Sequence, residues 1–149
     1  MHDTLVTLQG NLGGDVRFHE TAKGPVAHFR VGARPSWLDR QSGEWVSGQT
    51  TWYSVTAWRA LARHCADSLR RGDPVVVHGR LTHREWSSNG AQGVDLEVQA
   101  TFVGHDLNRG TSTFTRSTST SSAGTAEPAE RVAVEPAEGV VAESAEVAA

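Results

Sequence analysis

Four stretches of this chain alternate apolar and polar residues, and this pattern constrains the fold more than any other feature. The stretches are Val26–Arg34, Thr51–Trp58, Pro74–Trp86 and residues 94–103. In the second stretch, Tyr53, Val55 and Ala57 share one face and the intervening residues share the other. Because successive side chains of a β-strand point to opposite faces, each stretch predicts a strand with one buried face.

The order of the predicted elements defines a fold class. Residues from about Thr4 to Leu12 predict a first, largely apolar strand. Between the third and fourth strands, an apolar stripe at helical spacing predicts a helix, which ends near Gly72. The stripe consists of Trp58, Leu61, Ala62, Cys65 and Leu69. Five strands with one helix between the third and fourth predict an all-β protein with an OB-fold, a small five-stranded Greek-key barrel.

Composition divides the chain into two parts. Nine of the ten aromatic residues precede residue 110, and eleven of the fifteen residues from 111 to 125 are Ser or Thr. Glu-Pro-Ala-Glu then occurs at 127–130 and 135–138, and Glu-Ser-Ala-Glu at 143–146. We therefore predict an OB-fold domain over residues 1–110 and a disordered tail over 111–149. A short Ala/Glu helix is the alternative for the tail, although its prolines would interrupt it.

Several classes of protein are excluded by the sequence. No apolar run approaches the ~18 residues of a membrane span, and no basic region precedes an apolar N-terminal stretch. Cys65 is the only cysteine, which favours a reducing cytosol. The net charge of −3 divides into +1 over residues 1–110 and −4 over 111–149. The domain is thus nearly neutral, so the placement of its charges decides what it binds.

The polar faces of the predicted strands combine aromatic and basic residues. Trp52 and Trp58 share a face with Ser54 and Thr56, where a core-facing row would be apolar. Asp95 and Glu97 are expected elsewhere. Neighbouring strands add further basic and aromatic residues to these polar faces: His28, Arg30, Arg34, Arg80, Arg84 and Trp86. Stacking contributes ~1–3 kcal/mol per base and cations contact phosphates, so the pattern predicts binding of a single-stranded nucleic acid. The alternatives are partly buried packing, above all for Trp45 and Trp58, and a merely solvated face for the arginines.

Several short motifs resemble those of bacterial single-stranded DNA-binding proteins (SSBs), over about Thr4–Leu107. The similar segments are Gly10-Asn11-Leu12-Gly13 with Asp15, Ser36-Trp37, Thr51-Trp52-Tyr53, and Val75–Leu81 followed by Arg84 and Trp86. The resemblance implies sequence-independent binding and protection of single-stranded DNA in replication, recombination or repair. It implies base stacking on Trp37, Trp52, Trp58 and Trp86, a homotetramer, and a cytoplasmic, nucleoid-associated location.

The chain departs from the family pattern at three places. Glu85 stands where the family usually has Lys or Arg, and Tyr53 replaces the usual His. The sequence ends Glu146-Val147-Ala148-Ala149, without the family's acidic tip that ends in Phe. These departures indicate a divergent paralogue and weak or absent recruitment of partner proteins through the C-terminal tip.

Signatures of enzymes are not found. His78 and His83 are five residues apart on a predicted strand, so they face opposite sides and form no metal site. Gly10–Gly14 does not precede a helix as a phosphate-binding loop would, and there is no Gly-x-Ser-x-Gly motif. We therefore predict no catalysis, no metal and no cofactor. An OB-fold RNA-binding protein and a non-catalytic assembly adaptor remain the alternatives, since stacking does not distinguish DNA from RNA.

Overall fold

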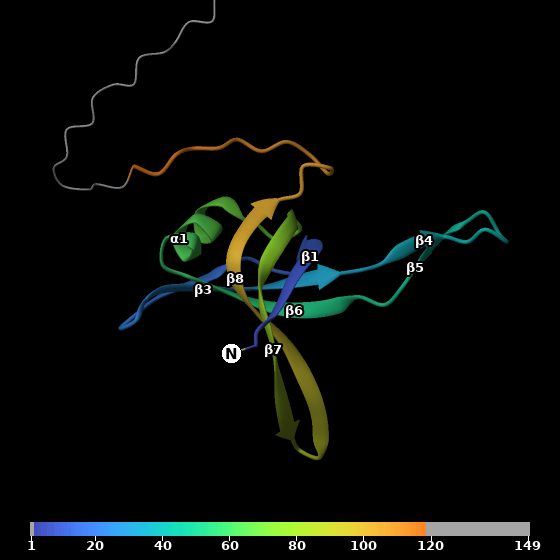
Figure 1. The fold of residues 1–149 in the computed structure, drawn as a ribbon, viewed down its shortest axis with the longest axis horizontal. Coiled ribbons are helices and arrows are strands. Elements are labelled where there is room, and N and C mark those ends of the chain that lie inside the picture. The colour runs from blue at the N-terminus through green and yellow to red at the C-terminus, as the bar shows by residue number, and fades with distance from the viewer. Residues whose placement is uncertain (1, 119–149) are drawn as a thin grey trace, which may run out of the picture. The chain divides into compact units, whose positions relative to one another are not determined.

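The computed structural model describes residues 2–118, which form eight strands and one helix (Figure 1). Residues 106–118 contain neither helix nor strand, and the remainder of the predicted tail, 119–149, lies outside the described residues. The elements are β1 (Thr4–Leu12), β2 (Arg17–Thr21), β3 (Gly24–Ala33), β4 (Ser36–Leu38), β5 (Trp45–Ser47), β6 (Thr51–Trp58), α1 (Arg59–Ser68), β7 (Pro74–Ser88) and β8 (Ala91–His105).

The five predicted strands form a closed barrel. The order is β1-β7-β8-β6-β3, and β3 pairs back onto the end of β1 at Asn11–Gly32 and Leu12–Val31. All pairs are antiparallel except β6 with β8. Gly10 makes the closure possible, because a Cβ at this position would overlap the carbonyl oxygen of Gly32. The predicted OB-fold barrel is confirmed.

The core lies inside this barrel and beneath α1. The inward-facing residues Phe29, Val31, Val55 and Val98 are at most 4% exposed. The helix adds Ala62 and Cys65 to the same cluster, and Leu69, directly after the helix, joins them, as the apolar stripe predicts. Burial raises the pKa of the Cys65 thiol to about 11, so this cysteine is a protonated core residue rather than a reactive group.

Two features of the sheet differ from the sequence prediction. The short strands β2, β4 and β5 were not predicted. In addition, His78 pairs with Phe102 and Gly79 with Ala100, so Thr101 is an extra residue in β8. Uninterrupted alternation over residues 94–103 predicts Phe102 on the same face as Val98. That expectation is wrong, because the bulge reverses the alternation. Phe102 is 54% exposed and stacks on His78, with ring centroids 4.8 Å apart.

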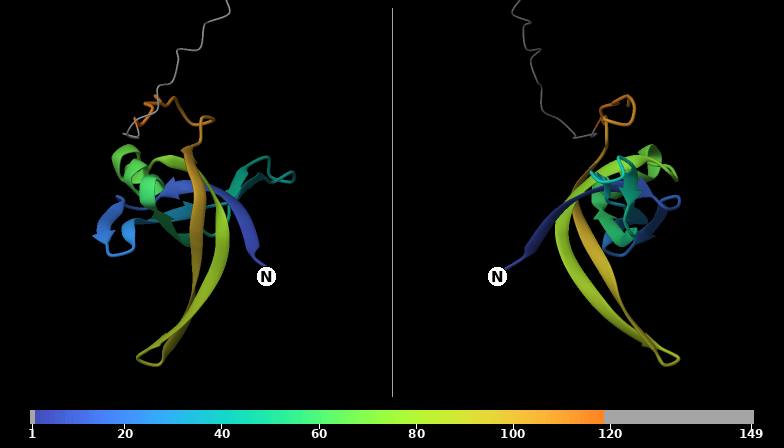
Figure 2. Two further views of the ribbon diagram at one scale, coloured as in Figure 1. Left: turned by 60° about the vertical axis from the view of Figure 1, so that its left-hand side comes forward. Right: turned by 90° about the vertical axis from the view of Figure 1, so that its right-hand side faces the viewer.

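Two hairpins extend from the barrel in different directions (Figure 1), and Figure 2 shows the one between β7 and β8 from two further sides. We call them the β4–β5 finger (residues 36–47) and the β7–β8 finger (residues 82–97). The second finger ends in a two-residue turn, Asn89-Gly90, in which both residues have positive φ angles (49° and 80°). Within residues 2–118, no helix combines the length and the apolar character that crossing a bilayer requires.

Candidate nucleic-acid interface

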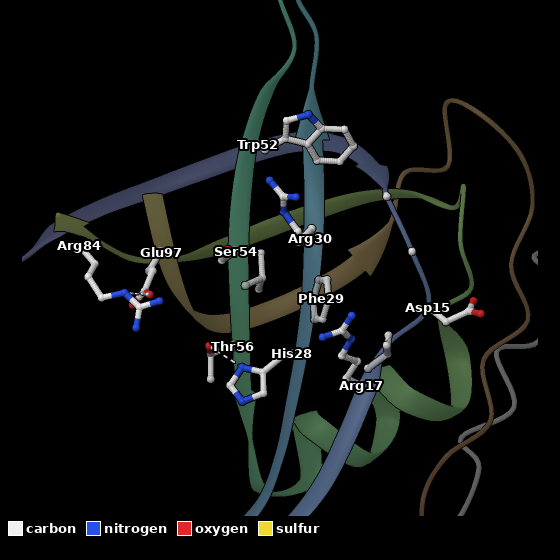
Figure 3. Close-up of a pocket in the computed structure, with 14 residues that line it drawn as sticks. Asp15, Arg17, His28, Phe29, Arg30, Trp52, Ser54, Thr56, Arg84 and Glu97 are labelled. Atoms are coloured by element: carbon white, nitrogen blue, oxygen red, sulfur yellow. Dashed lines mark hydrogen bonds and ion pairs between the residues drawn. The ribbon is translucent and has the colours of Figure 1, made fainter. Parts of the chain in front are cut away.

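A cleft of about 960 Å³ runs along the outer, polar face of β3 and β6 (Figure 3). The outward residues of these strands form its floor, the segment after β1 forms one wall, and Arg84 and Glu97 approach from the other side. It is lined by Gly13, Gly14, Asp15, Val16, Arg17, His28, Phe29, Arg30, Trp52, Ser54, Val55, Thr56, Arg84 and Glu97.

Trp52 lies at the end of the cleft where β3 and β6 lead toward the β4–β5 finger. Its side chain is 44% exposed, and the six-membered ring lies against Gly13 and Gly32, where any Cβ would crowd it. The guanidinium carbon of Arg30 is 5.0 Å from the centroid of the ring. A cation at this distance is attracted by the π-face of the indole. An aromatic surface and a positive charge therefore occupy one end of the cleft together.

Trp37 and Trp86, on the two fingers, repeat the support of an indole by a neighbouring glycine. Trp37, in β4, is 50% exposed and lies near Gly48, and Trp86, in β7, is 41% exposed and lies on Gly93 of the paired strand. A glycine beside each indole leaves room for the ring to rest on the backbone. All three tryptophans are thus supported on one side and open to solvent on another, which suits base stacking.

The other predicted site residues do not line the cleft. Trp58 ends β6, is only partly exposed, and precedes the first residue of α1. Arg34 donates a hydrogen bond from Nε to the carbonyl of Gly48 at the base of the β4–β5 finger, 3.1 Å away. Arg80 is paired with Asp3, at 3.7 Å, beside β1. Their roles in binding remain predictions.

Arg84 reaches the cleft but is paired with two carboxylates. Its Nε lies 3.4 Å from Glu97 and its guanidinium 3.9 Å from Asp95. The expectation that these acidic residues gather away from the basic ones is wrong. The reason is the register of the β7–β8 finger, which places Asp95 directly opposite Arg84 and on the same face.

Two basic residues of the cleft were missed as site residues. Arg17, in β2, is paired in register with His28, in β3, and both line the cleft. The His28 ring also hydrogen-bonds the Thr56 hydroxyl, at 3.2 Å. Arg17 was missed because β2 was not predicted. Alternation placed His28 on the same polar face as Arg30, which was a sufficient signal, but His28 was not included among the predicted binding residues.

Comparison with known proteins identifies the family of this chain. The model of the Single-strand binding protein family matches residues 4–106. This chain belongs to that family. It is 39% identical over 131 residues to "Single-stranded DNA-binding protein 2" of Streptomyces avermitilis, covering 88% of this chain and 83% of the relative. It is 37% identical over 120 residues to "Single-stranded DNA-binding protein 1" of Streptomyces coelicolor, covering 80% and 77%.

A solved structure agrees with this assignment. The chain resembles the crystal structure of a small single-stranded DNA-binding protein from Streptomyces coelicolor, with a TM-score of 0.69 and 35% sequence identity. The match covers 74% of this chain and all of that one.

The opening Gly-Asn-Leu-Gly motif, by which the chain resembles the single-strand binding protein family, has a clear structural role here. The Asn11 amide donates to the carbonyl of Gly72, at 3.0 Å, and the backbone N–H of Gly13 donates to the carbonyl of Arg30, at 2.9 Å. The first bond ties the end of β1 to the turn before β7, and the second holds the segment after β1 beside β3. Gly13 is thereby held under Trp52, so the motif builds the support of the indole.

Proposed function

We propose that this protein binds single-stranded DNA independently of sequence and protects it during replication, recombination or repair, without catalysing a reaction. The observation that carries the proposal is Trp52, half exposed on Gly13 and Gly32 beside Arg30, at one end of the cleft. Membership in the single-strand binding protein family and the names of its relatives support it.

The mechanism follows from the kinds of group that the surface presents. Every base has a π-face, so stacking on Trp37, Trp52 and Trp86 does not depend on sequence. Arg30 and Arg17 bind the phosphates of the intervening backbone, and Arg34, Arg80 and Arg84 extend that role along the strand. The helix α1 directs its apolar stripe into the core, so it is not a helix that reads the groove of a duplex.

We also propose that the protein is a homotetramer. Along Thr4–Gly10, β1 pairs with β7 on one side and has no ladder partner among residues 2–118 on the other. An unpaired edge is a template for a strand of a second copy. The outer face nearby carries the exposed apolar residues Leu5 (62%) and Phe102, which a second pair of copies would cover. Sedimentation equilibrium gives the mass of the assembly.

Two further parts of the proposal concern partners and location. A peptide with the sequence of residues 136–149 contains no aromatic side chain, so we expect it to bind poorly to pockets that accept a terminal Phe. Binding to the single-stranded DNA of a bacterium places the protein in the cytoplasm, associated with the nucleoid.

Titration of tryptophan fluorescence with oligo-dT tests the proposal. Stacking on indoles should quench the emission, and Trp52→Ala should weaken binding by about 5- to 150-fold. Trp52→Phe is the matched control, because it keeps a smaller aromatic ring and should recover part of the loss. A parallel titration with oligo-U distinguishes an RNA-binding protein, and binding of neither oligomer would indicate an assembly adaptor. Unchanged affinity in a folded Trp52→Ala variant would contradict the stacking role.

A further inference from the structure

The β4–β5 finger presents apolar side chains on both of its faces. Its register pairs Trp37 with Val46 and Leu38 with Trp45. Side chains of directly opposed residues share a face, and successive pairs point to opposite faces. Trp37 and Val46 therefore lie on one face of the ribbon, and Leu38 and Trp45 lie on the other.

Trp45 is the most exposed tryptophan of the described domain. Its side chain is 73% exposed and that of Leu38 is 49% exposed. Trp45 and Leu38 are absent from the core cluster and from the partly buried residues packed against it. Their cross-strand contact contributes only about 0.2–1 kcal/mol to the finger. The stability of the barrel thus gives no reason for an indole at this position.

We infer that Trp45, with Leu38 beside it, is a further base-stacking platform, and that one single strand contacts both faces of the β4–β5 finger. The inference rests on the proposed function and names an additional part of the same interface. The two faces belong to one ribbon that is two strands wide, and a sheet with its side chains is about 10 Å thick. A strand that stacks on Trp37 and passes around the fingertip therefore reaches Trp45 directly.

The fingertip offers one cation to this path, beside two carboxylates. Arg40 lies in the turn between β4 and β5, is exposed, and makes no ion pair within residues 2–118. The carboxylate of Asp39 accepts the backbone N–H of Gln41 at 2.8 Å, which directs it into the turn but leaves its charge in place. Glu44 is the remaining carboxylate of the turn, next to Trp45. A phosphate that crosses the fingertip thus finds a cation at the point of crossing, while stacking on Trp45 requires no charge.

Fluorine NMR of the full chain labelled with fluorotryptophan tests the inference, because each of the five tryptophans gives its own resonance. Single Trp→Phe variants assign the resonances, and the protein is titrated with oligo-dT. We expect the Trp45 resonance to shift along with those of Trp37 and Trp52. An unmoved Trp45 resonance at saturation would overturn the inference while leaving the proposed function intact. If the proposed function itself fails, the Trp52 resonance would not move either, so the two failures give different spectra.

Substitutions separate stacking from support of the finger. Trp45→Leu keeps an apolar cross-strand pair and removes the indole, so we expect at least about a fivefold loss of affinity for long oligo-dT. Leu38→Thr keeps the indole and breaks the apolar pair, and should change affinity less. Equal losses in both variants would indicate that Trp45 only supports the finger and would contradict the inference. A Trp45 resonance that depends on protein concentration without DNA would also contradict it, since a second copy would then be the occupant.

Discussion

The two fingers present indoles in different electrostatic surroundings. In the β4–β5 finger, the paired strands carry Ser, Trp, Leu and Val, and all charged residues lie in the turn. In the β7–β8 finger, the face that carries Trp86 also carries Arg84, Asp95 and Glu97. The paired strands of the first finger therefore offer stacking alone, with its one cation, Arg40, in the turn, whereas the second finger offers stacking beside a cation that is already paired.

This difference predicts that the two fingers would engage DNA differently. A phosphate that approaches Arg84 replaces two carboxylates, so binding at the β7–β8 finger exchanges one ionic partner for another. Exposed ion pairs contribute about 0–1 kcal/mol, so the exchange is feasible, but the net gain is small. Arg30 makes no ion pair within the described residues and lies on Trp52, so it is open to phosphate without such an exchange.

The largest expected effect comes from removing the indole of each finger. Trp37→Ala and Trp86→Ala should each weaken oligo-dT binding by about 5- to 150-fold, because each removes one stacked base. Fluorescence anisotropy of labelled oligo-dT measures the loss, and Trp→Phe at the same positions controls for the loss of a ring. A loss confined to one variant would show that only that finger binds DNA.

A smaller effect of opposite sign is expected from the carboxylates. Asp95→Asn frees Arg84 from one of its two partners, so affinity should rise by up to about fivefold, as expected for loss of an exposed pair. Asp67→Asn, at an exposed position of α1 outside the cleft and both fingers, is the matched control and should leave affinity nearly unchanged. Weaker binding of Asp95→Asn would indicate that Asp95 orients Arg84 for phosphate rather than competing with it.

Most of the barrel was predictable, because strands with one buried face alternate clearly. The bounds predicted for the strand Thr51–Trp58 agree with β6 residue for residue, and about Thr4 to Leu12 agrees with β1. Alternation failed for β2, β4 and β5, which are three to five residues long and exposed along their whole length. With no buried face, a strand has no contrast between apolar and polar positions to recognise.

The pairing of Arg84 was also predictable, though from a different signal. Asn-Gly between two alternating stretches predicts a two-residue hairpin turn, which fixes the register. Arg84 lies five residues before Asn89, and Asp95 lies five residues after Gly90, so counting from the turn places them opposite each other. By contrast, the bulge at Thr101 has no comparable signal, so the outward position of Phe102 required the structure.

The smallest expected effect is on the salt dependence of binding, and it tests the electrostatic difference directly. For single strands, log K falls with log salt by about 0.7 per neutralised phosphate. Arg30→Ala should therefore make the slope shallower by about 0.7. In the unsubstituted protein, Arg84 leaves Asp95 and Glu97 when it binds phosphate, and these carboxylates then take up cations. This uptake offsets the cations that DNA releases. Arg84→Ala should therefore change the slope by less than Arg30→Ala. Titrations with oligo-dT at several salt concentrations measure both slopes. Equal changes in the two variants would show that the carboxylates do not compete with phosphate, and the two sides of the interface would then be electrostatically alike.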